Sequence, residues 1–557
     1  MNKNVVKELT KQGCIVAKEA AEEITPRDVE NIKQLDSTPM YISKTMIEAL
    51  RSKENGELES SGDKIKDDGD KDSSEPLETD SSETVVTHED VTEGKEIEMS
   101  GGTKTVAKQR TEPEDHDKGE ISGEEKDVGG HSDKSSSESS TRSINIMDKR
   151  SRKDLRTKVE ILDEKEVSRD QKDVPEFLKY YNDRYEKMRK LLMRRVELKA
   201  ATTLNRLERR DKGDEATTVG IVKDKYQTNS GKWIVNLEDK TTTFKILAGE
   251  RDGQMIVPDE VIGVIGSMGG DILYADSIVR ADMPIPQGVK TTEEKVKAAY
   301  ISDLHMGSRD TMHDQLDKFG EWLSSDEAKD IGYLVITGDI VEGVGTYPGQ
   351  EEELEVKDIY KQYGLFEDWV EKLPEQMQIL VGPGNHDITR LAEPQPRLPE
   401  KVFPKIKDFN NVHLVQNPQS VRLHGIESEG IVNLMYHGYS FDGHADQLQN
   451  LRKVAYQEPH HVMIDLLKRR HLAPTYGTNS LSPEGEDHMV IQHKPDIFVS
   501  GHFHSHSNES YKGVNVINSS TFQAQTDFQK RVGHKPDPGK VTIVDYKTRD
   551  TEVKKFI

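Results

Sequence analysis

Five short segments in the second half of the chain carry side chains of the types that can bind metal ions. They combine carboxylates, an amide and imidazoles with neighbouring glycines, and they are Asp303-Leu304-His305, Gly338-Asp339-Ile340-Val341-Glu342-Gly343, Gly384-Asn385-His386-Asp387, Tyr436-His437-Gly438 and Gly501-His502-Phe503-His504. Two carboxylates, one amide oxygen and several imidazoles are enough to hold two divalent ions. A two-metal site of this makeup is suited to the hydrolysis of a phosphate ester.

Each segment follows a mostly apolar stretch of the kind that forms a buried β-strand. These stretches are Ala298–Ile301, Tyr333–Ile336, Met377–Val381, Ile431–Met435 and Ile497–Val499. In a layered α/β fold, ligands bind at the carboxyl ends of the strands. Five strands ending at one edge would gather the segments into a single cleft, with helices such as 312–323 covering the sheet.

Taken singly, the segments are weak signals. An Asp-x-His triplet often arises by chance, and a histidine that ends a buried strand, such as His437, is usually a hydrogen-bonded core residue. The Gly-His-x-His segment is more specific because it places two imidazoles at one edge. The order of the segments, the strands before them and the complete ligand set together favour a metal site.

The chain before these segments changes character several times. Residues 1–50 are expected to form an N-terminal helical domain, because Thr25-Pro26-Arg27-Asp28 has the pattern of a helix start. Residues 51–142 are expected to be a disordered acidic linker, since no aromatic residue lies between Tyr41 and Phe177. Residues 143–215 would hold a basic segment, either solvated or in contact with DNA phosphates, and a connecting helix over 176–199.

Short β-like runs separated by turns occupy residues 216–290. Trp233, Val235 and Leu237 alternate with polar residues after the turn Asn229-Ser230-Gly231, which predicts a small barrel of the OB type. Such a barrel would bind single-stranded DNA by aromatic stacking, or it would have a structural or partner-docking role. The last region, 294–557, contains the five segments.

Composition limits the possible partners and compartment. The formal net charge of this 557-residue chain is −24, but residues 52–142, with 27 acidic and 12 basic residues, account for −15 and leave −9 elsewhere. The acidic total therefore does not exclude a nucleic-acid partner. The single cysteine, Cys14, excludes an intrachain disulfide and a multi-cysteine zinc site. With no signal peptide and no apolar run of about 20 residues, we expect a soluble, cytoplasmic protein without a membrane partner.

The five segments resemble the motifs of the calcineurin-like metallophosphoesterase superfamily, all of which are intact here. The resemblance implies an α/β phosphoesterase sandwich with two divalent ions, most naturally Mn²⁺, with Fe²⁺ or Zn²⁺ as alternatives. The implied ligands are Asp303, His305, Asp339 and His504 for one ion, and Asp339, Asn385, His437 and His502 for the other, with Asp339 bridging. His386 would face the scissile phosphate as a catalytic proton donor, and either Glu342 or Asp387 would orient it.

Longer runs narrow the resemblance. The stretches 384–396, 437–442 and 501–523 resemble the small subunit of the archaeal family-D DNA polymerase, and the likeness extends over roughly residues 175–557. It implies a 3′→5′ exonuclease that proofreads single-stranded DNA 3′ ends for a separate large polymerase subunit, with the sliding clamp as a further candidate partner. The alternatives are a non-catalytic assembly subunit and a phosphodiesterase acting on another ester. The complete ligand set favours the exonuclease.

Overall fold

The computed structural model describes residues 15–16, 24–25, 27–28, 41–42, 155–164, 174–347 and 349–557. The chain divides into two compact units, Met1–Ile144 and Asn145–Ile557. In the first, β1 (Ile15–Val16) pairs in parallel with β2 (Tyr41–Ile42), and the backbone N–H of Thr25 donates to Oδ2 of Asp28 at 2.8 Å. The remainder of the predicted helical domain and all of the predicted acidic linker lie outside the described residues.

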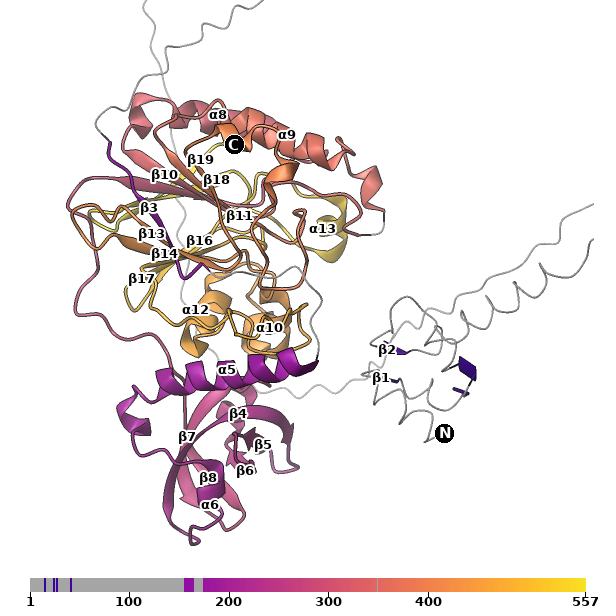
Figure 1. The fold of residues 1–557 in the computed structure, drawn as a ribbon, viewed down its shortest axis with the longest axis vertical. Helices are drawn as coiled ribbons and strands as arrows, with labels where there is room; N and C mark the ends of the chain where they lie inside the picture. The colour runs from indigo at the N-terminus through magenta and orange to yellow at the C-terminus, as the bar shows by residue number, and fades with distance from the viewer. Residues whose placement is uncertain are drawn as a thin grey trace, which may run out of the picture. The chain divides into compact units, whose positions relative to one another are not determined.

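Two six-stranded sheets face each other in the second unit (Figure 1). The first has the order β12-β11-β10-β9-β18-β19, with β9 (Lys297–Ile301), β10 (Ile331–Thr337), β11 (Gln378–Gly382), β12 (Val412–Leu414), β18 (Lys540–Asp545) and β19 (Thr551–Lys555). The second has the order β16-β17-β15-β14-β13-β3, with β3 (Val159–Leu162), β13 (Gln419–Leu423), β14 (Ile431–Met435), β15 (Ile497–Ser500), β16 (Ser507–Tyr511) and β17 (Val514–Asn518). The five apolar stretches that precede the predicted metal-binding segments are β9, β10, β11, β14 and β15, so they come from both sheets.

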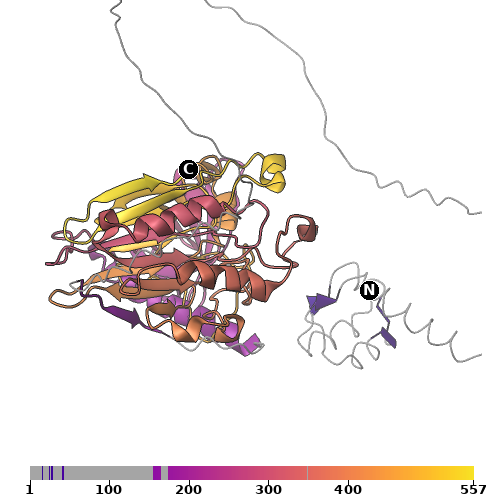
Figure 2. The same cartoon turned by 90° about the horizontal axis from the view of Figure 1, so that it is seen from above.

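Helices cover the outer faces of the two sheets (Figures 1 and 2). Side chains of β9 alternate: Ala299 and Ile301 pack with α8 (His313–Leu323) and α9 (Ile359–Val370), whereas Ala298 and Tyr300 pack between the sheets. The second sheet packs against α10 (Phe441–Gln447), α11 (Gln449–Arg452) and α12 (His460–Arg469). Every residue of β10 is buried, as expected for a strand covered on both faces.

A closed five-stranded barrel precedes the sandwich. Its strand order is β4-β5-β6-β8-β7, with β4 (Glu215–Gln227), β5 (Trp233–Glu238), β6 (Thr243–Ala248), β7 (Val261–Met268) and β8 (Ile272–Val279). The predicted turn at 229–231 joins β4 to β5, and α7 (Glu250–Met255) lies between β6 and β7. The barrel was predicted from sequence; its assignment to the OB type stays a prediction.

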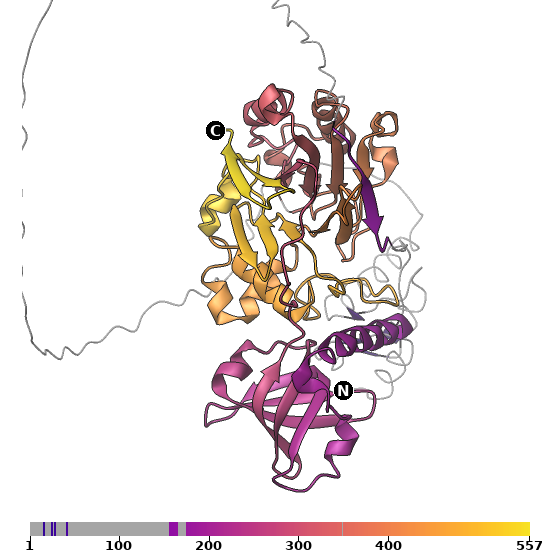
Figure 3. The same ribbon diagram turned by 90° about the vertical axis from the view of Figure 1, so that its left-hand side faces the viewer.

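The helix predicted at 176–199 is α5 (Val174–Leu192), which lies across the barrel (Figure 3). Its residues Met188 and Leu192 pack with Val219 and Val261 of the barrel. Leu178, near the start of the same helix, is 68% exposed, while Arg184 is buried. The guanidinium of Arg184 pairs with the buried carboxylate of Asp487, a long-range partner that lets a charged side chain lie on the buried side of the helix.

β3 lies within the range predicted to be a basic segment and connecting helix. It pairs antiparallel with β13 as an edge strand, and Val159 and Ile161 pack on the core between the sheets. In the predicted basic segment, Arg156 pairs with Glu427 at 2.7 Å, and Nζ of Lys158 donates to the carbonyl of Gly425. Residues 149–153 lie outside the described part of the chain.

The remaining short elements connect these parts. They are α6 (Leu204–Leu207), α13 (Asp527–Val532), and the 3₁₀ segments Val196–Leu198, Asp326–Ala328, Gln350–Glu352, Glu400–Val402 and Ile406–Asp408. Within the described residues, none of the helices has the length and apolar character needed to cross a bilayer.

Candidate metal centre

The seven predicted ligands lie in loops at the carboxyl ends of five strands. Asp303 and His305 follow β9, Asp339 follows β10, and Asn385 follows β11. His437 follows β14, and the pair His502 and His504 follows β15. The parallel strands of both sheets therefore deliver the ligands to one edge of the sandwich.

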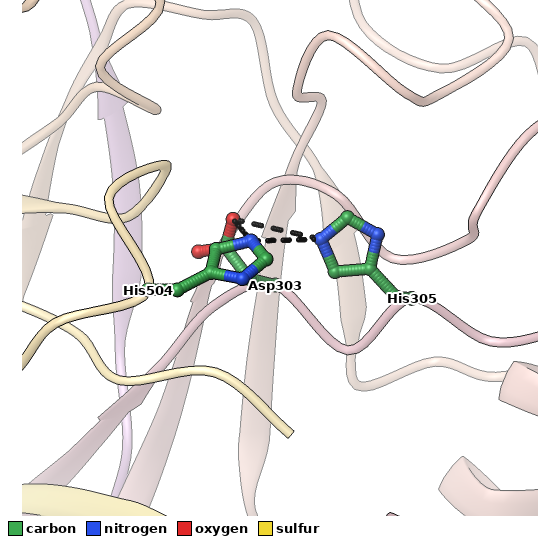
Figure 4. A group of neighbouring side chains, drawn as sticks. All are labelled: Asp303, His305 and His504. Atoms are coloured by element: carbon green, nitrogen blue, oxygen red, sulfur yellow. Dashed lines mark hydrogen bonds and ion pairs between the residues drawn. The ribbon is translucent and has the colours of Figure 1, made fainter. Parts of the chain in front are cut away.

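One group of donors consists of Asp303, His305 and His504 (Figure 4). Nε2 of His504 lies 3.3 Å from Oδ1 of Asp303 and 3.0 Å from Nε2 of His305. All three side chains are buried. Two imidazole nitrogens and a carboxylate oxygen that converge away from water need a cation or a proton between them.

A second group consists of Asp339, His437 and His502, with Asn385 beside it. Nε2 of His437 lies 3.2 Å from Oδ2 of Asp339 and 2.9 Å from Oδ1 of Asn385. The same Oδ2 atom of Asp339 lies 3.9 Å from Nε2 of His305 in the first group. Asp339 therefore stands between the two groups, where a bridging carboxylate would stand.

Hydrogen bonds on the far side of three imidazoles fix their orientation. Nδ1 of His437 donates to the carbonyl of Thr337 at 2.8 Å, and Nδ1 of His305 lies 2.9 Å from Oε2 of Glu342. Nε2 of His502 lies 2.7 Å from Oδ2 of Asp442. In each case the other ring nitrogen is left to face the centre, as metal-binding histidines require.

Two residues with this orienting position were not found from sequence. Asp442 contacts His502 as described above, and Nε2 of Gln529 on α13 lies 3.0 Å from Nδ1 of His504. Asp442 lies within the 437–442 run, where a carboxylate just after a ligand histidine was the available signal. Gln529 carries no such signal, because a neutral amide on a surface helix is commonplace in any sequence.

His386 lies at the edge of the centre, outside the two groups of predicted ligands, and forms a third group of possible donors with His305 and Glu342. Its Nδ1 donates to the main-chain carbonyl of Glu342 at 2.8 Å, and Oε1 of Glu342 is 3.7 Å away. Asp387 points elsewhere: it accepts from the backbone N–H of Gly384 at 2.8 Å and from the hydroxyl of Tyr363 at 3.1 Å. Of the two carboxylates considered from sequence, only Glu342 is near the His386 ring.

The charges inside the centre shift one another's pKa values. Burial disfavours the charged form of His305, but Glu342, Asp339 and Asp303 outweigh it and raise its pKa to about 9. For His437 the effect of burial is likewise outweighed by Asp339, and its pKa rises to about 10. Burial opposes ionisation of Glu342, yet His305 lowers its pKa to about 2. Without a metal, protonated imidazoles neutralise the carboxylates.

The backbone of the centre is strained where it carries the ligands. Five of the seven predicted ligands have a positive φ: Asp303 (55°), His305 (48°), Asp339 (48°), His502 (73°) and His504 (54°). Such conformations cost about 1–3 kcal/mol each and cluster at functional sites. The glycines beside them are also constrained, because a Cβ on Gly384 would overlap Oδ1 of Asp339 and one on Gly501 would overlap Oδ2 of Asp303.

Curated relatives establish the family. The DNA polymerase II small subunit of Methanocaldococcus jannaschii is 38% identical over 424 residues, which cover 72% of this chain and 69% of the relative. The chain belongs to the DNA polymerase II small subunit family. The small subunit of Archaeoglobus fulgidus is also 38% identical, over 67% of this chain and 75% of its own. The resemblance to the archaeal family-D small subunit that was predicted from sequence is thus confirmed.

The wider family of B subunits of DNA polymerases alpha and epsilon matches residues 298–509. This range contains all five predicted metal-binding segments of this polymerase small subunit. Among solved structures, an archaeal phosphodiesterase covers 47% of this chain and 99% of its own at 15% identity, with a TM-score of 0.22. A likeness this weak supports no conclusion about activity.

The donor set in this member of the family fits two divalent cations. Imidazole, carboxylate and amide donors suit Mn²⁺, Fe²⁺ and Zn²⁺. Nε2 of His305 and Nε2 of His504 face each other and the Asp303 carboxylate, an arrangement that a cation would relieve. Besides the donor set, such a site needs hydrogen bonds that orient its histidines. His305, His437 and His502 each have one.

Proposed function

We propose that this chain is the proofreading exonuclease of a two-subunit DNA polymerase and removes nucleotides from single-stranded 3′ ends by two-metal phosphodiester hydrolysis. The observation that carries the proposal is the position of Asp339. Its Oδ2 atom lies 3.2 Å from His437 and 3.9 Å from His305, between two donor groups in which no predicted ligand is missing. A subunit kept only for assembly has no need of this arrangement.

The charge balance of the centre suits an anionic substrate. The seven proposed ligands include only two carboxylates, Asp303 and Asp339, against the four positive charges of two divalent ions. The excess of about +2 attracts a phosphodiester and stabilises the charge that develops on its oxygens. When bound, the ions would lower the pKa of a water to supply hydroxide at neutral pH. We propose Mn²⁺ as the ion, with Fe²⁺ or Zn²⁺ as substitutes.

His386 would donate a proton to the leaving group. Hydrolysis of the last phosphodiester releases the 3′ oxygen of the preceding nucleotide, which needs a proton. Because Nδ1 of His386 donates to the carbonyl of Glu342, Nε2 is the atom that can give that proton. Glu342 holds both His386, through its carbonyl, and His305, through its carboxylate. We therefore assign Glu342, and not Asp387, the task of positioning His386.

The partners follow from the proposal and the family. A large subunit would carry out DNA synthesis, while this chain edits the end that the large subunit releases. The barrel, proposed to be of the OB type, would dock the partner or guide the single strand, and the clamp would be a further partner. The acidic character of the chain agrees with a large subunit that supplies most of the contacts to DNA phosphates.

The test is digestion of single-stranded oligonucleotides by the full chain, alone and with its large subunit, in the presence of Mn²⁺. A 5′-labelled oligonucleotide should give a ladder that shortens from the 3′ end, while a 3′-labelled one should release labelled mononucleotide at once. Asp339→Ala should abolish both. A complex that binds Mn²⁺ but digests nothing would support an assembly subunit. Faster hydrolysis of a cyclic nucleotide would support a different phosphodiesterase.

A further inference from the structure

Two aromatic side chains lie beside His386 at the rim of the metal centre. The rings of Tyr347 and Phe528 are stacked, with centroids 6.5 Å apart and an interplanar angle of 30°. Tyr347 also meets the His386 ring edge-on at 6.3 Å. The pair therefore extends from the proposed proton donor outward to Phe528, whose side chain is 53% exposed.

Both rings are held by residues of the metal centre itself. The hydroxyl of Tyr347 donates to Glu353 at 2.8 Å and to Oε1 of Glu342 at 3.3 Å. Phe528 sits on α13, where Thr526 and Gln529 form a capping box and Gln529 contacts His504. The position of the two rings is thus tied to the ligands His305 and His504 through Glu342 and Gln529.

The surroundings of Phe528 match the chemistry of a nucleotide. A half-exposed phenylalanine stacked on a fixed tyrosine offers a flat apolar face, on which any base can stack. Arg531 is one helical turn further along α13, on the same side as Phe528. It is exposed, and within the described part of the chain it forms no ion pair, so it is available to a phosphate.

We propose that Phe528, backed by Tyr347, is the stacking platform for the 3′-terminal base of single-stranded DNA and holds that end beside His386 and the metal ligands. The proposal rests on the exonuclease function and adds a basis for its selectivity. A base that is paired and stacked in a duplex cannot reach the platform without an unstacking cost, whereas an unpaired terminal base can. Phe528 would therefore favour mispaired ends.

The experiment compares two 5′-labelled oligodeoxythymidylates with the full chain in complex with its large subunit. One has a normal 3′ nucleotide, and the other ends in an abasic tetrahydrofuran residue. The wild type should lose about 5- to 150-fold in kcat/KM on the abasic substrate, the range expected for one base–aromatic stack. On the normal oligonucleotide, kcat/KM of Phe528→Ala should be lower than that of the wild type by the same factor, mostly through a higher KM. On the abasic oligonucleotide, the variant and the wild type should have the same kcat/KM.

Further substitutions of Phe528 distinguish stacking of a base on an aromatic ring from contact with any large apolar side chain. Phe528→Trp should restore discrimination between the two substrates, whereas Phe528→Leu, which is apolar but not flat, should behave like Phe528→Ala. Tyr360→Ala, at a tyrosine of α9 that is 53% exposed, is the matched control and should behave as wild type. Bound Mn²⁺ should be unchanged in every variant.

Three results would overturn the platform. One is that wild type and Phe528→Ala discriminate equally between the normal and the abasic oligonucleotide. Another is that Phe528→Ala lowers kcat/KM by the same factor on both oligonucleotides. The third is loss of the large subunit from the Phe528→Ala complex with normal digestion of the oligonucleotide, which would make this surface a protein interface. A wild-type complex that digests neither substrate would overturn the exonuclease proposal itself, and the platform with it.

Discussion

Nε2 of His305 and Nε2 of His504 lie 3.0 Å apart, while Nδ1 of His305 is hydrogen-bonded to the carboxylate of Glu342. A neutral His305 would present only a lone pair to His504. The amide nitrogen of Gln529 donates to Nδ1 of His504, so Nε2 of His504 carries a proton that faces both this lone pair and the carboxylate of Asp303. A proton thus occupies the position that a cation would take.

Metal binding should therefore release protons. In the metal-free centre His305 and His437, with pKa values of about 9 and 10, are charged at pH 7, and both must lose a proton to bind an ion. Their protonated forms persist below those values, so the apparent affinity should rise between pH 6 and pH 8. Calorimetric titration with Mn²⁺ in two buffers of different ionisation enthalpy measures the release. Binding that is independent of both buffer and pH would contradict this account.

Removing the carboxylate between the two donor groups should cost metal as well as activity. Asp339→Ala should lower bound Mn²⁺ from two ions to at most one per chain and reduce digestion by at least about 100-fold. Metal analysis after gel filtration and an oligonucleotide assay check the two effects. Asp368→Ala, at an exposed carboxylate that pairs with Lys405 on the surface, is the control and should change neither.

His386 should be separable from the ligands. Because it contacts Glu342 and lies outside both donor groups, His386→Ala should keep both ions while kcat falls by about 10²- to 10⁴-fold. Metal content and single-turnover digestion should be measured on the same preparation. If the variant lost an ion, His386 would be a ligand and its assignment as proton donor would be wrong.

The close approach of Gly501 to Asp303 should make this glycine necessary for tight metal binding. In Gly501→Ala the new methyl group would overlap Oδ2 of Asp303 and the Ser302 side chain, so the carboxylate must move. We expect about a 10- to 100-fold weaker affinity for Mn²⁺. Gly364→Ala is the matched control, because a Cβ there meets nothing within 4 Å. It should bind Mn²⁺ normally and gain about 0.5–1 kcal/mol of stability from helix propensity.

The buried pair Arg184–Asp487 should hold the barrel to the sandwich. Nε of Arg184 on α5 donates to Oδ2 of Asp487 at 2.6 Å, and both side chains are almost fully buried. Arg184→Met would leave a buried carboxylate without its cation and should cost about 3–5 kcal/mol, measured by denaturant unfolding. Lys179→Ala, at an exposed position of the same helix, should cost less than about 0.5 kcal/mol.

The same pair predicts a pH dependence. Burial opposes ionisation of Asp487, but His471 and Arg184 outweigh it and hold its pKa well below the ordinary value of an aspartate. A depressed carboxylate contributes its full stability above the pKa of the unfolded chain, about 3.9, and loses it as the pH falls further. The unfolding free energy should therefore drop below about pH 4 in the wild type, and the drop should be smaller in Asp487→Asn.

The candidate site could be read from the sequence because its residues are chemically unusual and each follows a strand. The rule that strands deliver ligands at their carboxyl ends singled out the segments that contain Asp303, His437 and His504, while the roles of these residues as ligands were implied by the family resemblance and stay a prediction. Gln529 and Asp442 could not be predicted from sequence, because they orient His504 and His502 only when the right helix packs beside each histidine. The burial of Arg184 likewise depends on Asp487, which is 303 residues further along the chain. Periodicity within one helix carries no information about such a partner.

The left-handed backbone at Asp303, His305, Asp339, His502 and His504 restricts how this centre can decay. Glycine, asparagine, aspartate and histidine tolerate that conformation, whereas β-branched side chains do not. A lineage that gives up hydrolysis is therefore expected to replace these residues with asparagine or glycine long before valine or isoleucine. Asparagine or glycine at several of these positions would mark a degenerate centre that keeps the fold, and such a relative could be recognised by its substitutions alone.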